Sequence, residues 1–277
     1  MKVFQTIPEF REWRQRQRGR VSFTPTMGNL HDGHIACHQH ASLLARHSIV
    51  SIFVNPTQFA PTDDFAKYPR TLERDLDLLK ANGCSAVFAP SVDQMYPDGI
   101  STKVIAGSMA NGLEGDFRPG HFDGVAAVCL KLFQIVEPDV VVFGSKDLQQ
   151  LRVIEQMVRD FNIPIEIDAI PTCRDENGLA LSSRNSYLTP DATVKASQLY
   201  RALDVAILLY CAGQTAAEVE TITAGFLEDR NWDVDYLALR DGETLGPLTS
   251  KSIVVAALGA AKLDGVRLID NVTRVLV

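Results

Sequence analysis

Residues 21–34, with the sequence VSFTPTMGNLHDGH, change from a strand pattern to a helix pattern within one short stretch. The buried strand is interrupted at Pro25 and Gly28, and we expect a helix to begin at an Asp32 N-cap and to run to about His47. The first N–H groups of a helix have no partner within it, and the helix dipole places partial positive charge there. This stretch therefore predicts an anion site suited to a phosphate chain.

The alternation of strand and helix continues through the first part of the chain. We expect an amphipathic helix within residues 1–20, then strands at 47–54, 86–89, 139–143 and 165–170, and helices at 71–83, 125–136 and 147–160. Such alternation indicates an α/β fold with a Rossmann-like, doubly wound parallel sheet. Ligands of these sheets bind beyond the carboxyl ends of the strands. We therefore expect one crevice to gather the segments that follow strands: TMGNLHDGH, NPTQF, GSKDLQQ and PTCRDENGLALSSRN.

The pattern changes after about residue 176. Helices are expected at 189–211 and 216–228, and the alternating runs VDYLALRD, SIVVAALGA and VRLIDN favour a small antiparallel sheet. The sequence thus predicts two domains, a Rossmann-like domain over 1–175 and a smaller α+β domain over 176–277.

The composition restricts the class of protein. A net charge of −7 offers no general basic field for nucleic acid, so an anionic ligand needs a local cluster of donors. No apolar run approaches the ~18 residues of a membrane span, and the N-terminus is too charged for a secretory signal. The five cysteines are scattered and odd in number, which indicates buried thiols in a reducing compartment. A cytoplasmic enzyme is the resulting expectation.

His31 and His34 flank the start of the first long helix. We expect both imidazoles to donate hydrogen bonds to nucleotide phosphates, with His34 stabilising charge that grows in the transition state. Two other interpretations stay open, in which the pair only caps the helix, or binds zinc together with His38. Gly28 and Gly33 are expected to let the backbone approach the ligand closely.

A second group of candidate donors lies further along the chain. Lys146 would place an ammonium at the phosphates, and Asp147 would accept hydrogen bonds from ribose hydroxyls, although a solvated helix start is the favoured explanation of this pair taken alone. Ser182, Ser183 and Arg184 form a compact set of donors suited to phosphate oxygens.

Two glutamines suggest a carboxylate substrate. The neutral amides of Gln58 and Gln150 can orient a hydroxy acid without an ion pair that would weaken its carboxylate as a nucleophile, unless both are ordinary surface residues. Asn55 and His121 are weaker candidates. Three acidic residues could contact an amine or a hydrated Mg²⁺: Asp63, Asp64 and Asp75. The simpler expectation is that they lie in a solvated loop.

Taken together, these motifs resemble the pantoate–β-alanine ligase family, the pantothenate synthetases. The resemblance covers nearly the whole chain through PTMGNLHDGH, FVNPTQF, YPRTLERDL, RPGHFDGV, KDLQQL and GLALSSRNSYL, in the family's order. HxGH alone marks a wider nucleotidyltransferase superfamily, whereas its combination with NPTQF, the paired glutamines and LSSRN is specific.

The resemblance implies an ATP-dependent reaction in two steps. Pantoate attacks the α-phosphorus of ATP to give pantoyl adenylate and pyrophosphate, and the amine of β-alanine then releases pantothenate and AMP. Mg²⁺ is expected to arrive with ATP rather than at dedicated protein ligands. The family folds as a Rossmann-like domain that binds nucleotide and pantoate, followed by a smaller lid domain, and it is usually a homodimer.

The resemblance also implies roles for individual residues. His34, His31 and Lys146 are the catalytic candidates, and Gln58, Gln150 and Asn55 are the substrate-binding candidates, with Gln58 also near β-alanine. The ATP site would comprise Met27, Gly28, Asn29, Leu30, His31, Asp32, Gly33, His34, Gly144, Ser145, Lys146, Asp147, Cys173, Leu181, Ser182, Ser183 and Arg184.

Some positions depart from the family pattern. Ser145 stands where the family often has Glu or Gln, Cys37 and His38 replace a leucine and a basic residue, and Thr57 replaces a frequent methionine. Two other functions remain alternatives: another HxGH nucleotidyltransferase acting on a small carboxylic acid or phosphate, and a histidine-rich metal-binding or scaffold protein.

Overall fold

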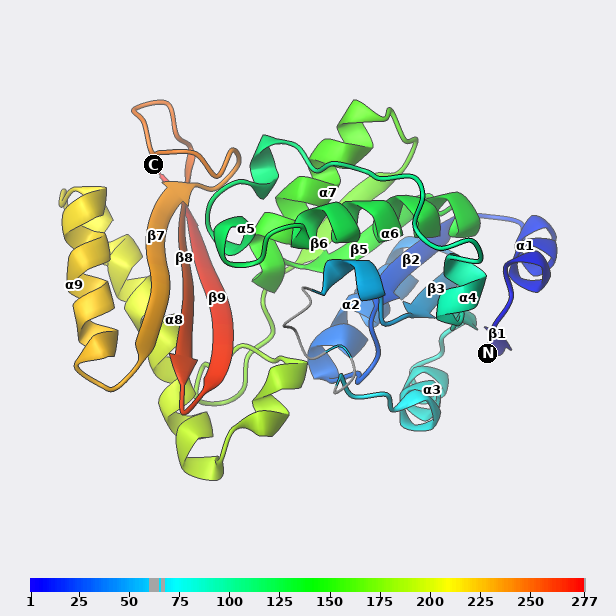
Figure 1. Ribbon diagram of the computed structural model, residues 1–277, viewed down its shortest axis with the longest axis horizontal. Helices are drawn as coiled ribbons and strands as arrows, with labels where there is room; N and C mark the ends of the chain where they lie inside the picture. The colour runs from blue at the N-terminus through cyan, green and yellow to red at the C-terminus, as the bar shows by residue number, and fades with distance from the viewer. Residues whose placement is uncertain (60–64, 66–67, 277) are drawn as a thin grey trace. The chain divides into compact units, whose positions relative to one another are not determined.

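The computed structural model describes residues 1–59, 65 and 68–276 (Figure 1). The chain divides into two compact units, one formed by Met1–Ser145 with Val153–Pro171 and the other by Lys146–Arg152 with Thr172–Val277. Within the described residues, no helix combines the length and the apolar character that a membrane crossing requires.

The first unit contains a six-stranded, all-parallel sheet in the order β1-β4-β3-β2-β5-β6. This architecture confirms the expected Rossmann-like α/β fold. Figure 1 shows α6 and α7 on one side of this sheet and α2 and α3 on the other. The strands are β1 (Lys2–Phe4), β2 (Val21–Thr26), β3 (His47–Ile52), β4 (Ala86–Phe88), β5 (Val140–Gly144) and β6 (Glu166–Ile170).

The α-helices associated with this sheet are α1 (Ile7–Gln15), α2 (Asp32–Leu44), α3 (Leu72–Ala81), α4 (Val92–Met95), α5 (Glu114–Phe117), α6 (His121–Val136) and α7 (Leu148–Asp160). Short 3₁₀ turns lie at η1 (Pro56–Gln58), η3 (Ser108–Ala110) and η4 (Ser145–Asp147). Helices cover both faces of the sheet, so its central strands are buried even at polar positions such as Ser22 and Ser51. Val21, Phe23 and Val141 are accordingly 0% exposed.

The N-terminal segment differs from the single helix expected for residues 1–20. Strand β1 pairs in parallel with β4 before α1 begins, so the segment forms the edge of the sheet as well as a helix. The ring of Phe10 is 0% exposed and packs edge-on against Phe4 at 5.7 Å. A strand of three residues has too short a pattern to be distinguished from a loop in the sequence.

The second unit contains helices α8 (Pro190–Cys211) and α9 (Ala216–Glu228) and the strands β7 (Asp233–Asp241), β8 (Val254–Leu263) and β9 (Val266–Val275). The turn η5 (Ser183–Tyr187) precedes α8. The three strands pair antiparallel in sequence order, as the alternating runs predict. One apolar core joins the helices to this sheet and includes Leu203, Ile207, Leu227 and Leu239.

The division between the units differs from the expected boundary at residues 175 and 176. It falls after Pro171, and Lys146–Arg152 belongs to the second unit. Two hydrogen bonds explain this assignment: Asn271 Nδ2 donates to the Lys146 carbonyl at 2.7 Å, and Arg152 Nε donates to the Gly242 carbonyl at 2.8 Å.

None of the five cysteines, all of which lie in the described part of the chain, forms a disulfide. Cys37, Cys84 and Cys129 are buried as expected, but Cys173 is only partly buried and Cys211 is exposed. The expectation of buried thiols was therefore wrong for Cys211, because the last residue of α8 lies beyond the apolar core that the helix covers. Burial raises the pKa of Cys84 and of Cys129 to about 12, which makes these two thiols poor nucleophiles.

Candidate active site

The turn after β2 is closed by its two histidines. His31, not Asp32, is the N-cap of α2, and Asp32 is the first helical residue. The ring of His31 accepts the Gly33 N–H at 3.2 Å, while the His31 N–H is donated to Nδ1 of His34 at 3.3 Å. The expected Asp32 cap was wrong because an imidazole nitrogen here takes the place of a capping carboxylate.

This reciprocal cap fixes the chemistry of the two rings. Their centroids lie 4.0 Å apart, and each ring accepts a backbone N–H at Nδ1. A neutral imidazole that accepts at Nδ1 carries its proton on Nε2. The cap therefore makes Nε2 the hydrogen-bond donor of both His31 and His34, as contact with phosphate oxygens requires.

The carboxyl ends of three neighbouring strands lead into predicted site segments. The sheet order places β2 between β3 and β5, and all three run parallel. Their ends are followed by 27–34, by 53–59 and by the Gly144 turn, respectively. These three segments therefore leave the same edge of the sheet. The expected crevice that gathers them together with PTCRDENGLALSSRN stays a prediction.

Gln58 lies in η1, where it is 8% exposed and held by several contacts. Its side-chain oxygen accepts from Asn55 Nδ2 at 3.2 Å, and its Nε2 lies 3.0 Å from Sδ of Met27. The backbone carbonyl of Gln58 lies 2.8 Å from Nδ1 of His121. The structure thus brings four sequence-predicted residues together: Met27, Asn55, Gln58 and His121.

Asn55 is 1% exposed, and both ends of its amide are used inside the protein. Besides Gln58, its Nδ2 donates to the Gly124 carbonyl at 3.1 Å, and its Oδ1 accepts from the Tyr96 hydroxyl at 2.9 Å. These bonds fit a residue that orients Gln58 better than one that contacts the substrate. Sequence reasoning missed Tyr96, because its partner lies 41 positions away and no local pattern marks it.

Asp75 is not the solvated loop residue that the sequence led us to expect. It lies in α3, is 0% exposed, and accepts the backbone N–H groups of Asn29 and Leu30. Those two N–H groups are therefore bonded to a protein carboxylate, within a segment that the resemblance places in the ATP site. Asp63 and Asp64 lie outside the described residues.

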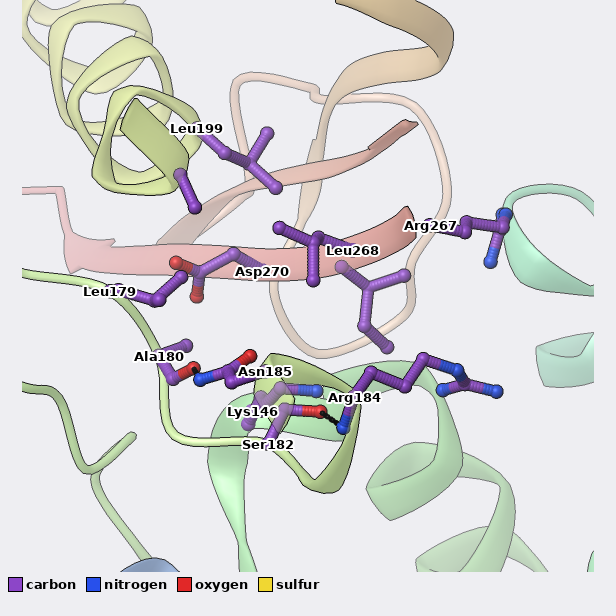
Figure 2. A pocket seen from close by; sticks show the side chains of 12 residues that line it. Lys146, Leu179, Ala180, Ser182, Arg184, Asn185, Leu199, Arg267, Leu268 and Asp270 are labelled. Carbon is purple, nitrogen blue, oxygen red and sulfur yellow. Dashed lines mark hydrogen bonds between the residues drawn. The ribbon is translucent and has the colours of Figure 1, made fainter. Parts of the chain in front are cut away.

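The second unit contains a pocket with a polar wall (Figure 2). In Figure 2, Lys146, Ser182 and Arg184 lie on one wall of the pocket, and Leu268 and Asp270 of β9 lie opposite. Ser182 caps its own turn, since its hydroxyl accepts the Arg184 N–H at 3.2 Å. Donor residues predicted from two separate motifs therefore line one pocket.

The opposite wall of this pocket is held by a buried ion pair. Arg174 donates to both oxygens of Asp270, at 2.6 and 3.0 Å, and its guanidinium lies 3.8 Å from the ring centroid of Tyr200. Burial raises the pKa of Asp270, and the hydrogen bonds from Arg174 oppose that shift. Sequence reasoning missed Asp270, because the VRLIDN run indicates only a strand and its partner lies 96 positions away.

Comparison with known proteins decides the family. The family model described as pantoate-beta-alanine ligase matches residues 2–273. The chain belongs to the pantoate–β-alanine ligase family.

Individual relatives agree with this membership. The pantothenate synthetase of Moorella thermoacetica is 48% identical over 281 residues, which cover 98% of each chain. The crystal structure of pantothenate synthetase from Thermus thermophilus matches with a TM-score of 0.92 and 43% identity, covering 98% of this chain and 99% of that one. A Francisella tularensis pantoate–β-alanine ligase, described as complexed with beta-gamma ATP and β-alanine, matches with a TM-score of 0.84, 34% identity, and coverage of 98% and 97%.

The departures from the family pattern lie in packing contacts. The hydroxyl of Ser145 donates to the Ile170 carbonyl at 2.8 Å, which ties the end of β5 to the neighbouring strand. Sγ of Cys37 lies 3.7 Å from the position that a Cβ on Gly144 would occupy, so this thiol packs behind the turn.

The remaining candidate residues include Gln150, Cys173 and Asp147. Gln150 lies in the first turn of α7 and is half-buried, beside the buried Gln149. The carbonyl of Cys173 accepts the Leu181 N–H at 2.9 Å, which closes the loop that ends in the Ser182–Arg184 turn. Asp147 lies 3.7 Å from the Lys146 ammonium.

The zinc interpretation receives no support from His38. Its side chain is 0% exposed and its Nε2 lies 3.2 Å from the Asn82 carbonyl, whereas His31 and His34 contact each other. Over residues 1–59, 65 and 68–276, the structure contains no group of three or more His, Cys, Asp or Glu residues arranged to hold a metal ion.

Proposed function

We propose that this chain joins pantoate to β-alanine through a pantoyl adenylate, using the residues described above. In the first step, the pantoate carboxylate attacks the α-phosphorus of ATP, and the bond from that phosphorus to the bridging oxygen of pyrophosphate breaks. In the second, the amine of β-alanine attacks the acyl carbon, AMP leaves with the electron pair of the C–O bond, and the amine loses a proton. Activation is needed because an unmodified carboxylate would have to expel a very poor leaving group.

Two sets of donors support nucleotide binding in this proposal. The Nε2 atoms of His31 and His34 donate to phosphate oxygens at the start of α2, and His34 stabilises the charge that grows on the phosphates. Lys146, Ser182 and Arg184 supply further donors from the pocket of the second unit. The family expectation of an ATP-bound Mg²⁺ adds charge neutralisation at the phosphates.

We assign pantoate to Gln58 and Gln150, and β-alanine to the neighbourhood of Gln58. The oxygen of the Gln58 amide is engaged by Asn55, and one hydrogen of its Nε2 faces Sδ of Met27, so the second hydrogen is the donor that we assign to a hydroxy acid. We assign Asn55 to the support of that amide. A lid role for the second unit and a homodimer follow from the family resemblance, and a cytoplasmic location follows from the composition; all three remain predictions.

The observation that carries the proposal is the reciprocal cap of His31 and His34, because it sets both Nε2 atoms as donors at a helix start. His34→Ala should lower turnover by ~10²-fold or more with the fold intact. The measurement is pantoate-dependent exchange of labelled pyrophosphate into ATP, with circular dichroism to confirm folding.

His40→Ala is the matched control, since His40 lies in the same helix but pairs with Asp168 at 2.8 Å, away from the turn. Its exchange rate should stay within about twofold of the wild-type rate. Unchanged exchange in His34→Ala would remove this histidine from the mechanism. Exchange driven by another carboxylic acid but not by pantoate would favour the alternative HxGH nucleotidyltransferase.

A further inference from the structure

The turn that delivers His31 and His34 needs support from outside itself. Gly28 and Asn29 have φ angles of +81° and +50°, in the left-handed region, so this segment is neither strand nor helix. A non-glycine residue in that region is strained unless its surroundings hold it there. The structure provides that support from helix α3.

Asp75 of α3 holds the amide side of the turn. Its two carboxylate oxygens accept the N–H groups of Asn29 at 2.8 Å and Leu30 at 2.9 Å, and the Thr71 hydroxyl donates to the same carboxylate at 3.1 Å. The side chain is 0% exposed, so water does not compete for these bonds. A buried carboxylate with charge-assisted bonds to two successive amides is a rigid anchor.

The neighbouring Arg74 holds the opposite side of the same turn. Its guanidinium donates to the Leu30 carbonyl at 3.1 Å and lies 3.4 Å from Oδ1 of Asn29. The Leu30 N–H is therefore bonded to Asp75, and the Leu30 carbonyl is bonded to Arg74, the preceding residue of α3. These contacts determine both the position and the direction of the peptide that leads into His31.

We propose that Asp75, assisted by Arg74, is a positioning residue that sets the imidazoles of His31 and His34 for adenylation. Leu30 directly precedes His31, and the His31 N–H is bonded to Nδ1 of His34. A shift of the anchored peptide therefore moves both rings together. The inference rests on the catalytic role proposed for His34, because Asp75 itself faces the protein and acts through the turn.

The decisive variant is Asp75→Asn. It preserves the size of the side chain but replaces one acceptor oxygen with an NH₂ group that opposes a backbone N–H. We expect kcat of pantoate-dependent pyrophosphate exchange to fall by ~10-fold or more, because a displacement of ~1 Å can cost ~10²-fold. The KM for pantoate should stay within about threefold, since no contact of Gln58 is removed.

Asp139→Asn is the matched control. Asp139 accepts the Val21 N–H at 2.7 Å through one oxygen, so this variant replaces a carboxylate acceptor with a neutral amide at the opposite end of the same strand β2 and leaves an oxygen that can still accept. Its exchange kinetics should match the wild type. ¹⁵N spectra of the histidine rings should show shifted His31 and His34 signals in Asp75→Asn and unchanged ones in Asp139→Asn, provided both variants are folded.

The outcomes separate this inference from the proposed function. If exchange and the ring signals of folded Asp75→Asn match the wild type while His34→Ala is inactive, the positioning role is wrong and the function stands. If His34→Ala is fully active, the proposed function itself fails. Should Asp75→Asn not fold, Arg74→Met tests the same turn, and wild-type kcat with unshifted rings in that variant would overturn the inference.

Discussion

The position of His38 shows how a single residue couples the site-bearing helix to pH. Burial lowers its pKa from the ordinary value of 6.5, and the hydrogen bond to the Asn82 carbonyl only partly opposes this effect. Its Nδ1 is buried with no hydrogen-bond partner among the described residues. The folded chain therefore resists a proton that the unfolded chain accepts near pH 6.5.

We predict that this resistance reduces stability in mild acid. Because the unfolded state binds more protons below pH 6.5, the free energy of unfolding should fall as pH decreases through that value. His38→Gln keeps a donor for Asn82 but cannot titrate, so it should reduce the slope between pH 6.5 and 5 by up to ~1.4 kcal/mol per pH unit. Urea unfolding at several pH values measures it, with the partly exposed His47→Gln as control. An unchanged slope in His38→Gln would contradict the prediction.

The residue types in the sequence identify most of the candidate hydrogen-bond donors of the site, but not the residues that hold those donors in position. His31, His34, Lys146 and the Ser182–Arg184 turn were identifiable because short polar motifs follow strands. Asp75 appeared to be one acidic residue in a loop, since nothing local indicates that its partners lie 45 and 46 positions earlier. Long-range hydrogen bonds of this kind leave no periodic pattern in the sequence.

At the scale of elements, the close packing of α6 on η1 controls the position of Gln58. A Cβ on Gly124 would lie 2.3 Å from the Thr57 carbonyl oxygen and 2.7 Å from the Gln58 N. Only a glycine permits this approach of two backbones. The helix also begins at His121 rather than at the expected Val125, which brings the His121 ring to the Gln58 carbonyl.

Gly124→Ala should therefore displace η1 and weaken pantoate binding. We expect kcat/KM for pantoate to fall by ~10-fold or more, while the affinity for ATP changes by less than about threefold. Steady-state kinetics and calorimetry measure the two quantities. Gly225→Ala is the control, because it lies in helix α9 with nothing within 4 Å of its added methyl group. Equal losses for both substrates would refute the selective effect.

Most elements were predictable for a physical reason that also explains the exceptions. The strands β2, β3, β5 and β6 are short segments that contain apolar residues and are bounded by turn residues, and α8 and α9 follow Thr189 and Thr215, which cap them as side-chain acceptors. Strand β1 was missed because its three residues are stabilised only by pairing with β4. Pairing across 80 or more positions is a tertiary effect that local sequence does not encode.

At the scale of the whole molecule, the chain combines two compact units with a net charge of −7. Like charges on two copies repel each other, so a homodimer of this chain requires interface contacts, either apolar or ionic, that outweigh that repulsion. Salt screens the repulsion between copies while leaving apolar burial intact or strengthened. The two contributions therefore respond to ionic strength in a way that distinguishes an apolar interface from one built on ion pairs.

We predict a homodimer that persists when the salt concentration is raised. Multi-angle light scattering should give twice the 30.5 kDa mass of the chain in low salt and again in about 0.5 M NaCl. At the higher salt the Debye length is only a few ångströms, so charge interactions between copies are screened while apolar contacts persist. The matching control is the same measurement over a tenfold dilution series, which detects a weak equilibrium. A mass of one chain in both salts would refute the dimer. A dimer that dissociates as salt rises would instead show that ion pairs between copies hold it, since only those attractions weaken on screening.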